Sequence, residues 1–587
     1  MRLPSRLRLL AAVSCVATVA VLATEGRAAS TALWPGVTHA RTVQFTNHGP
    51  VVLNVIAGPR PGGLTTLEPL LSNDSVLGRE TVSSMQRRVP DGVTAGVNAD
   101  FSRFDNGRVS GIFMRHGDLA AAPNARRSSV GVLTDGTLDI RKIGLRATWA
   151  GTTVHPLAAL NDPPTPGGAA VYTAGYGTAT PSAPGSTAAV LFPFPLVTPG
   201  VDLTANVVEV VQGGAPVPIP LGGAVLVASG PQGSALATEA VVGSALRVRF
   251  DFVPGWAGVA DAVGGGPELV RGGKAVASPN EWFTPLQLRP RAPRSAVGQL
   301  PNGRIILVAV DGRQPGYSTG LTNAELGRTM VRLGAIRAMA FDGGGSTTLA
   351  FDGAVLNKPS DGRERAVGSA LVFHYTGAFL PPPVAQVSPN GDGVGDAQTL
   401  SYRVSAPSTV DVTLTRPDGS VAVTESGPRE IGAYPIPFPP PPNETGAEKA
   451  GVAEGRWRLR ITATDDVGRA STMTRTFVVD TTLGFLRAPG RRAVLPGGRE
   501  IPISWRLARD ARVSVTVLDA AGRVVRRGLA GSGPWQAGEH RVVWDGLDQR
   551  RQRLQGTYEI RVAATSVLGR TELVRAIVMT KARLPGR

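Results

Sequence analysis

The chain has 587 residues, which at ordinary domain sizes predicts about three to five domains. Its 42% hydrophobic and 18% charged residues, with 73 Gly and 48 Pro, are typical of a turn-rich globular protein and exclude disorder throughout. Cys15 is the only cysteine, so a disulfide framework is excluded. No later segment approaches the ~20 unbroken apolar residues of a membrane helix, which excludes a polytopic membrane protein.

The net charge of +17 at first suggests a nucleic-acid-binding protein. The cations are mostly arginines, however, and they are scattered without a stripe or run, whereas phosphate-backbone affinity needs clustered cations. We therefore expect no nucleic-acid partner. Loose attraction to an anionic cell envelope remains compatible with this charge.

Residues 1–29 are expected to form a secretory signal peptide. Arg2, Arg6 and Arg8 precede the apolar run 9–23, and the small residues Gly26 and Ala28 suit a cleavage site. The sequence thus predicts a protein that is secreted or held in the cell envelope, with no transmembrane span after signal removal. Loss of Cys15 with the signal would exclude cysteine nucleophiles and cysteine-ligated zinc.

Residues 30–376 form one large unit of short β-like runs with few helices. The one convincing helical period covers residues 324–333, capped by Asn323 or Thr322, between apolar strands at 304–310 and 338–341. A strand, a helix and a strand in this order suggest a parallel pairing. We therefore expect an α+β domain of mixed, largely antiparallel sheets, followed by a Pro-rich linker at 377–387.

The rest of the chain contains a repeat. Residues 401–404, 412–419 and 457–464 recur about 100 residues later at 504–507, 515–522 and 558–565, each with alternating apolar and polar residues. This period matches an immunoglobulin-like sandwich. We expect two all-β sandwiches, at 388–481 and 482–583. The second, with its Trp544-Asp545-Gly546 turn, resembles the Ig-like domain of flagellar hook-capping proteins, an appendage or spacer.

A glycine-rich acidic segment opens the first sandwich. Asn390, Asp392 and Asp396 present hard oxygen ligands at close spacing, as short calcium loops do. A Gly-Asp turn at a domain boundary is the alternative, and the sequence leaves both open. No cofactor is required by the sequence, and a divalent cation such as calcium is possible.

Three polar, glycine-dense segments next to apolar strands are the candidates for chemistry. In 341–349, an acidic strand end is followed by three glycines that let backbone N–H groups approach an anion, unless the segment is only a tight hairpin. The second segment, 310–321, places an acid and an arginine after a buried strand, and the third, 357–366, holds both signs of charge. The candidate residues are Asp342, Gly343, Gly344, Gly345, Ser346 and Thr347; Asp311 and Arg313; and Asn357, Ser360, Arg363, Glu364 and Arg365.

Together these segments resemble the phosphodiester glycosidase family. The resemblance extends upstream through 97–101, 261–270 and 291–298, so it covers roughly residues 90–375 and adds Asn98, Asp100 and Arg294 as candidates. One departure is Ser102, which stands where the family has a second aromatic residue and so puts the sugar subsite in doubt. A second departure is Ser295, a mild change that keeps a hydroxyl group.

The resemblance implies a glycosidase that hydrolyses sugar-1-phosphodiesters, such as N-acetylglucosamine-1-phosphodiesters in envelope polymers or glycoconjugates. Arg294, Arg365 and the backbone of 343–346 would bind the phosphate, and Asp342 or Glu364 would stabilise the sugar cation or activate water. Asp311 would orient these groups or bind a metal with Asp342. The alternative is a non-catalytic envelope glycan-binding or adhesion protein that uses the same cleft as a receptor.

Overall fold

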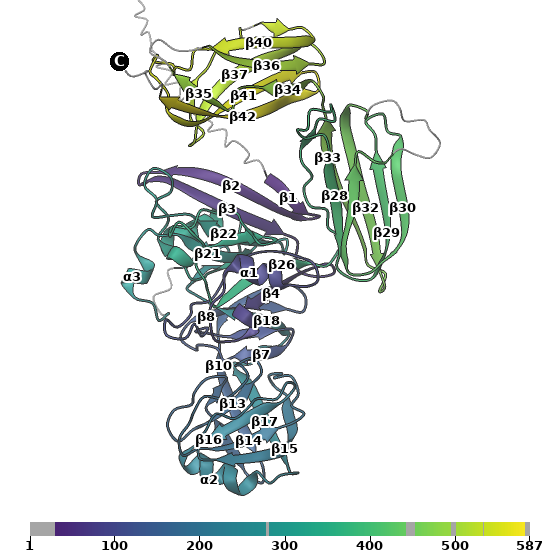
Figure 1. Cartoon of the computed structure of the whole chain (residues 1–587). Helices are drawn as coiled ribbons and strands as arrows, with labels where there is room; N and C mark the ends of the chain where they lie inside the picture. The colour runs from purple at the N-terminus through teal and green to yellow at the C-terminus, as the bar shows by residue number, and fades with distance from the viewer. Residues whose placement is uncertain (1–29, 277–280, 442–451, 495–499, 532, 582–587) are drawn as a thin grey trace, which may run out of the picture.

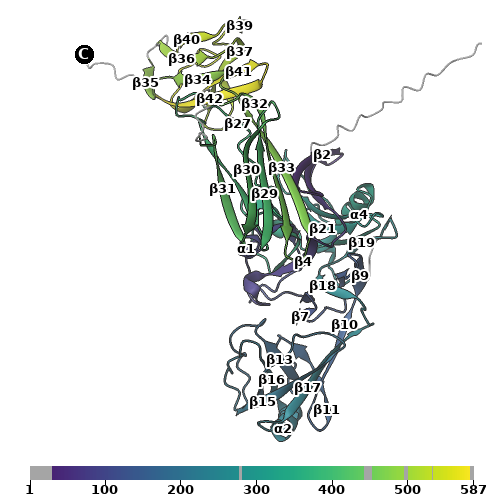
Figure 2. The ribbon, with the colours of Figure 1, turned by 90° about the vertical axis from the view of Figure 1, so that its right-hand side faces the viewer.

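The computed structural model describes residues 30–276, 281–441, 452–494, 500–531 and 533–581. The predicted signal peptide, residues 1–29, lies outside the described residues. The molecule is elongated: a unit formed by residues 144–253 lies at one end, two C-terminal β units lie at the other, and the remaining sheets lie between them (Figures 1 and 2). Within the described ranges, no helix has the length and apolar character needed to cross a bilayer.

Two antiparallel sheets form the centre of the molecule. The larger has the order β1 (Ser30–Trp34), β2 (Val37–Thr46), β3 (Gly49–Gly58), β22 (Ile305–Val310), β21 (Arg294–Gln299), β23 (Arg337–Ala340), β19 (Glu268–Arg271) and β20 (Lys274–Ala275). The smaller has the order β25 (Ala354–Val355), β24 (Leu349–Phe351), β5 (Val93–Asn98), β26 (Ser369–Tyr375) and β4 (Thr65–Leu71).

These two sheets pack face to face, because their strands carry buried apolar residues such as Ile56, Leu307, Val97 and Phe373 in one common core. Helix α4 (Asn323–Arg332) covers the outer face of the larger sheet, and α1 (Val82–Arg88) covers that of the smaller sheet. The helices therefore lie outside a β-sandwich.

A third sheet, next to this core, leads into the end unit. Its order is β7 (Asp118–Ala121), β6 (Phe113–Arg115), β18 (Val259–Gly264), β8 (Ser128–Leu133) and β9 (Leu138–Lys142). The end unit consists of helix α2 (Gly230–Glu239) and one eight-stranded sheet, and its core around Trp149 extends to Met114, Leu119 and Ala262 of the third sheet. The order of the eight-stranded sheet is β11 (Val154–Leu157), β10 (Gly144–Ala150), β17 (Ala245–Val253), β15 (Asp202–Gln212), β14 (Thr187–Leu191), β16 (Ala224–Ala228), β13 (Ala169–Thr173) and β12 (Ala159–Leu160).

The C-terminal region forms two units of two sheets each. In the first unit, one sheet has the order β27 (Gln386–Val387), β33 (Ala470–Val479), β32 (Gly455–Asp465), β29 (Ser408–Thr415) and β30 (Val421–Arg429). The other sheet pairs β28 (Gln398–Val404) with β31 (Gly432–Phe438). The second unit has β34 (Leu483–Arg487), β36 (Ile501–Leu507), β40 (Gly538–Trp544), and β35 (Arg491–Val494), β42 (Gly569–Lys581), β41 (Gly556–Ser566), β37 (Ala511–Asp519), β38 (Val524–Arg526), with β39 (Pro534–Trp535) paired to β37. The repeated sequence segments lie in corresponding strands, β28 with β36, β29 with β37, and β32 with β41.

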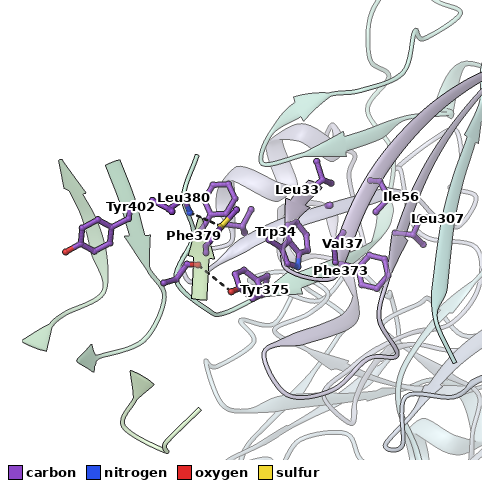
Figure 3. Packing of buried hydrophobic residues seen from close by; sticks show 14 of the residues in the cluster. Leu33, Trp34, Val37, Ile56, Leu307, Phe373, Tyr375, Phe379, Leu380 and Tyr402 are labelled. Atoms are coloured by element: carbon purple, nitrogen blue, oxygen red, sulfur yellow. Dashed lines mark hydrogen bonds between the residues drawn. The ribbon is translucent and has the colours of Figure 1, made fainter. Parts of the chain in front are cut away.

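The first C-terminal unit packs directly on the central sheets. Trp34 stacks on Tyr375 with ring centroids 5.6 Å apart, and Phe379 and Leu380 continue this core toward Tyr402 in the C-terminal unit (Figure 3). The backbone N–H of Leu380 donates to the sulfur of Met473 at 3.2 Å. The two parts therefore share one apolar core.

The expected α+β class for residues 30–376 is wrong, because this region is mostly β. Among the described residues of this region, the helices are α1, α2, α4 and the four-residue α3 (Pro285–Leu288), together with the short 3-10 turns η1 (Ser72–Asp74) and η2 (Gly344–Ser346). The dense Gly and Pro turns favour strands joined by short connections over helices.

The expected parallel pairing around α4 is also wrong. Strand β21 lies between β22 and β23 and pairs antiparallel with both. The physical reason is the tight turn at 300–304, where Leu300 N–H donates to Arg304 O and Gly303 adopts a φ of 82°. This turn joins β21 and β22 as a hairpin, so β22 pairs with the strand that precedes it in the sequence and not with β23. The helix itself is as predicted, with Thr322 as its N-cap in a capping box with Glu325.

Candidate active site

A cavity of about 850 Å³ opens where strands β5, β18 and β23 end and strand β21 begins. Short segments far apart in the sequence contribute to its wall. The lining residues are Arg79, Phe101, Ser102, Phe104, Ser110, Arg127, Gly266, Pro267, Phe283, Leu286, Gln287, Pro290, Ala292, Arg294, Arg313, Asn323, Phe341, Asp342, Gly343, Gly344, Ser346, Arg365, Ala366 and Val367. Among these, Asp342 is the carboxylate, and five residues are arginines.

The main chain fixes Asp342 at the end of β23. Its N–H donates to Ala99 O at 3.0 Å, and its carbonyl oxygen accepts from Asn98 Nδ2 at 2.7 Å. The side chain is half-buried and faces the cavity. Burial raises the pKa of Asp342 to about 6, although the Ser346 hydroxyl and the charge of Arg365 favour the ionised form. Asp342 is thus an acid that ionises close to neutral pH.

Asn98 and Asp100 are buried next to the cavity-lining residues Asp342 and Phe101. Asn98 Oδ1 accepts from Ser295 Oγ at 2.6 Å and from Thr348 N at 3.1 Å. The carboxylate of Asp100 accepts from the backbone N–H groups of Phe101 and Gly111 at 2.8 and 2.6 Å. Burial raises the pKa of Asp100 to about 7, and the nearby charge of Asp342 contributes to this rise. Both residues position the loops that carry the cavity wall.

The glycine loop is held mainly by protein acceptors. Gly344 N–H donates to Pro293 O at 2.9 Å, Ser346 N–H lies 3.4 Å from Gly343 O, and Gly343 N–H supports the Asp342 carboxylate. A Cβ on Gly345 would lie 2.1 Å from Arg365 Nη2 and 2.3 Å from Asp361 Oδ2, so a larger residue there would displace this ion pair. With these amides engaged, the arginines are the main anion-binding groups that face the cavity.

Three arginines contact this loop. Arg294 is buried, and its guanidinium donates to the carbonyl oxygens of Leu321, Gln287 and Pro290 at 2.8–2.9 Å; burial lowers its pKa to about 10. Arg365 pairs with Asp361. Arg313 has a φ of 57°, and its guanidinium lies 3.1 Å from the position that a Cβ on Gly344 would occupy.

Arg79, Arg127 and Phe283 also line the cavity, and no sequence motif indicated them. Arg127 lies 4.9 and 4.8 Å from the ring centroids of Phe101 and Phe283, which contact each other at 5.5 Å. Phe283 thus supplies a second aromatic ring beside Phe101, although Ser102 stands at the family's usual position. Isolated arginines in polar loops carry no motif, so only the fold could place them here.

Asp311 lies outside the cavity lining and is fully buried. It accepts from Asn357 Nδ2, Lys358 N and the Tyr317 hydroxyl, each at 3.0 Å, and burial raises its pKa. Asn357 also binds the backbone of Leu349 and Thr347. Asp311 and Asn357 therefore join the loops after β22 and β25.

The other predicted residues lie around the site without lining it. Glu364 accepts from Ser83 N at 3.0 Å and Ser83 Oγ at 2.5 Å, at the start of α1. Arg363 is exposed, Ser360 Oγ lies 3.3 Å from Asp361 Oδ1, and the buried Thr347 Oγ1 has no partner among the described residues. Of the three predicted catalytic carboxylates, the structure thus places Asp342 at the cavity and Asp311 and Glu364 outside it.

The candidate calcium loop forms a turn stabilised by its own backbone. Asp396 accepts from the N–H groups of Asn390, Gly391 and Gly393 at 2.8–2.9 Å. Asp392 Oδ2 accepts from Phe485 N at 2.7 Å, which joins the loop to the second C-terminal unit. Within the described ranges, no group of three His, Cys, Asp or Glu side chains has the arrangement of a metal site.

Fold and site together define a β-rich domain with an arginine-lined cavity around one ionisable carboxylate, an arrangement suited to an anionic substrate. Comparison with known families makes this class specific. Residues 200–374 match the model of the phosphodiester glycosidase family, and residues 493–567 match the FlgD Ig-like domain. Both resemblances predicted from the sequence are confirmed. The phosphodiester glycosidase match begins at residue 200, so it does not include the 97–101 segment, to which the resemblance seen in the sequence extends.

Individual proteins give more distant similarities. A segment of 117 residues is 35% identical to the SPbeta prophage-derived uncharacterized protein YomE of Bacillus subtilis. This segment covers 20% of this chain and 18% of YomE, so the chain spans less than a fifth of the length of that relative. A hypothetical protein from Synechocystis is 24% identical, with coverages of 58% and 62% and a TM-score of 0.48. The zebrafish N-acetylglucosamine-1-phosphodiester alpha-N-acetylglucosaminidase catalytic domain, auto-inhibited by its pro-peptide, is 14% identical, with coverages of 59% and 87% and a TM-score of 0.32.

Proposed function

We propose that the protein is an exported glycosidase that hydrolyses sugar-1-phosphodiesters, with N-acetylglucosamine-1-phosphodiesters of envelope polymers or glycoconjugates as the substrate class. The observation that carries the proposal is the half-buried Asp342 in a cavity lined by five arginines. The phosphodiester glycosidase match at 200–374 supports it.

The reaction divides between the carboxylate and the arginines. The guanidinium groups of Arg313 and Arg365 bind the phosphate oxygens and stabilise the charge that develops on the leaving group. Water attacks C1 of the sugar, the C1–O bond breaks, and its electron pair remains on the phosphate monoester. Because this leaving group is stable without protonation, one carboxylate is enough: ionised Asp342 accepts the water proton and stabilises the positive ring carbon.

The test compares free-sugar release from a synthetic N-acetylglucosamine-1-phosphodiester by the wild type and by Asp342→Asn. We expect at least a roughly 100-fold loss of kcat in the variant, because general-base catalysis contributes about 10² to 10⁴. Asp466→Asn, at an exposed site in the first C-terminal unit, is the matched control. Equal turnover in all three proteins would reject the role of Asp342. Titrated binding without any turnover would instead support the glycan-receptor alternative.

Export is the second part of the proposal and rests on the cationic and apolar pattern of residues 1–29. We expect the protein in the envelope or culture fraction of its native host, with a mature N-terminus near residue 30. N-terminal sequencing of the protein from that fraction checks this expectation, and recovery of the uncleaved chain from the cytoplasm would refute it.

A further inference from the structure

The cavity carries more positive charge than one phosphodiester can balance. Five arginines line it against the carboxylate of Asp342, and only Arg365 among the five has a carboxylate partner, Asp361, in the described part of the chain. A sugar-1-phosphodiester brings one negative charge, whereas a diphosphate diester brings two. Like charges that share a partly dehydrated space are costly unless anions balance them.

The arginines form two groups on different segments. Arg294, Arg313 and Arg365 contact the glycine loop 343–345, next to Asp342. Arg79 and Arg127 contact the other wall instead: Arg79 Nε lies 3.4 Å from Ser102 Oγ, and Arg127 lies over the Phe101 ring. In the first group, Arg313 and Arg365 are placed for a phosphate attached to the sugar at Asp342, whereas the guanidinium of Arg294 donates to backbone carbonyl oxygens. The second group provides a separate place for a second phosphate.

An apolar lip follows the second group of arginines at the cavity mouth. It consists of Phe104 and Leu286, which line the cavity with 95% and 84% of their surface exposed, and Trp282, which is 63% exposed. Arg79 donates to the backbone oxygen of Arg103, directly before Phe104, and Arg127 contacts Phe283, next to Trp282. Exposed apolar residues that gather at a binding cavity are typical of a contact site.

We propose that the cavity takes a sugar diphosphate ester whose far end is an aliphatic chain, as in a lipid-linked sugar diphosphate. This inference rests on the proposed function and names its substrate more closely. The sugar lies at Asp342, one phosphate at each arginine group, and the chain on the lip. We favour an aliphatic chain because Leu286 has no ring on which a nucleobase could stack, and because Arg126, 4.9 Å from the Trp282 ring centroid, already covers one face of that ring.

The reaction then needs water alone. The water oxygen forms the new bond to C1, the C1–O bond breaks, and the electron pair leaves with the alkyl diphosphate. One water proton passes to Asp342 and then to solvent. The products are the free sugar and the alkyl diphosphate.

The experiment measures kcat/KM of the full chain on four N-acetylglucosamine substrates: the farnesyl monophosphate diester, the farnesyl diphosphate diester, the methyl diphosphate diester and UDP-N-acetylglucosamine. We expect the farnesyl diphosphate to exceed both the farnesyl monophosphate and the methyl diphosphate by about tenfold or more. It should also exceed the UDP-sugar. Equal or faster turnover of the monophosphate would overturn the second phosphate subsite, and a preference for the UDP-sugar would overturn the aliphatic chain. No detectable turnover of any of the four substrates would count against the proposed function itself.

Variants separate the two subsites. Arg79→Gln should reduce the diphosphate preference, with exposed Arg328→Gln on α4 as the matched control. The double variant Phe104→Ser, Leu286→Ser should reduce the preference for the farnesyl over the methyl diphosphate ester. Leu221→Ser is its control, because Leu221 is 89% exposed on the end unit. Equilibrium titration with farnesyl diphosphate and farnesyl monophosphate gives a readout independent of turnover. Equal affinity for farnesyl diphosphate and farnesyl monophosphate, measured in titrations that reach saturation, would overturn the proposal.

Discussion

At the scale of single residues, Asp342 combines two opposed influences. Protein around the carboxyl group removes water and favours the neutral form, whereas the Ser346 hydroxyl and the charges of Arg365 and Arg127 favour the ionised form. The result is a pKa of about 6 in place of the ordinary 3.8. If ionised Asp342 is the base, turnover should rise as the pH increases through about 6.

The same shift predicts a change in stability for Asp342→Asn. The folded chain retains this proton up to about pH 6, whereas the unfolded chain loses it near pH 3.8, so stability falls between these values as the pH rises. The neutral asparagine avoids this loss. We expect the variant to be more stable by on the order of 1–3 kcal/mol above pH 6 and to gain little below pH 4.

Denaturant unfolding at pH 4 and pH 8 measures this difference, again with Asp466→Asn as the control. A gain of the same size at both pH values would contradict the assignment, because it would not follow the titration of Asp342. A simultaneous loss of turnover and gain in stability would show that the site is held at a cost to the fold.

At the scale of elements, an ion cluster around the buried Glu68 joins three strands. Glu68 on β4 lies 2.9 Å from Arg115 Nη2 on β6, 2.9 Å from His374 Nδ1 on β26 and 2.7 Å from His116 Nε2. Burial would raise the pKa of Glu68, but the hydrogen bond from His374 and the charge of Arg115 outweigh it and lower the pKa to about 2. The cluster therefore fixes the smaller central sheet to the sheet that contains β6.

Glu68→Gln should lower the free energy of unfolding by about 3 kcal/mol at neutral pH, because it leaves Arg115 and His374 without their buried counter-charge. A group with a lowered folded pKa stabilises above its unfolded value of 4.5, and this contribution is lost as the pH falls through about 2. The deficit of the variant should thus shrink below pH 4.5. Unfolding curves across pH 2.5–7 measure it, with exposed Glu209→Gln as the control. A deficit that stays constant with pH would indicate a packing defect instead.

Elements with local signals were predictable from the sequence, and contacts between distant segments were not. Helix α4 followed from its period and its Thr322 cap, and the second Ig-like domain followed from the repeat. The position of β21 between β22 and β23 was not predictable from the sequence, because the order of strands depends on which neighbouring strands pair as a hairpin. Likewise, the 341–349 segment indicated Asp342, but Arg79 and Arg127 reach the cavity from loops that have no motif of their own.

At the scale of the whole molecule, the first C-terminal unit is part of the central core and not a loosely attached appendage. Arg475 of β33 donates to the backbone oxygens of Leu33 at 2.9 Å and Leu380 at 3.0 Å, and Trp34 stacks on Tyr375 at the same joint (Figure 3). The second unit has its own separate core. It meets the first through smaller contacts, among them the Asp392–Phe485 hydrogen bond.

This difference predicts unequal effects of two truncations. Ending the chain at residue 481 should leave the melting temperature of the central sheets and the turnover close to those of the full chain, because the second core is independent. Ending it at residue 376 should lower that melting temperature by roughly 5–10 °C, because Trp34 and its neighbours lose a few kcal/mol of apolar burial. Calorimetry of the three lengths, with free-sugar release as the second readout, measures both effects. Arg475→Met in the full chain tests the same joint without exposing it to solvent. If neither ending the chain at residue 376 nor this substitution changed the melting temperature, the joint would not stabilise the central sheets.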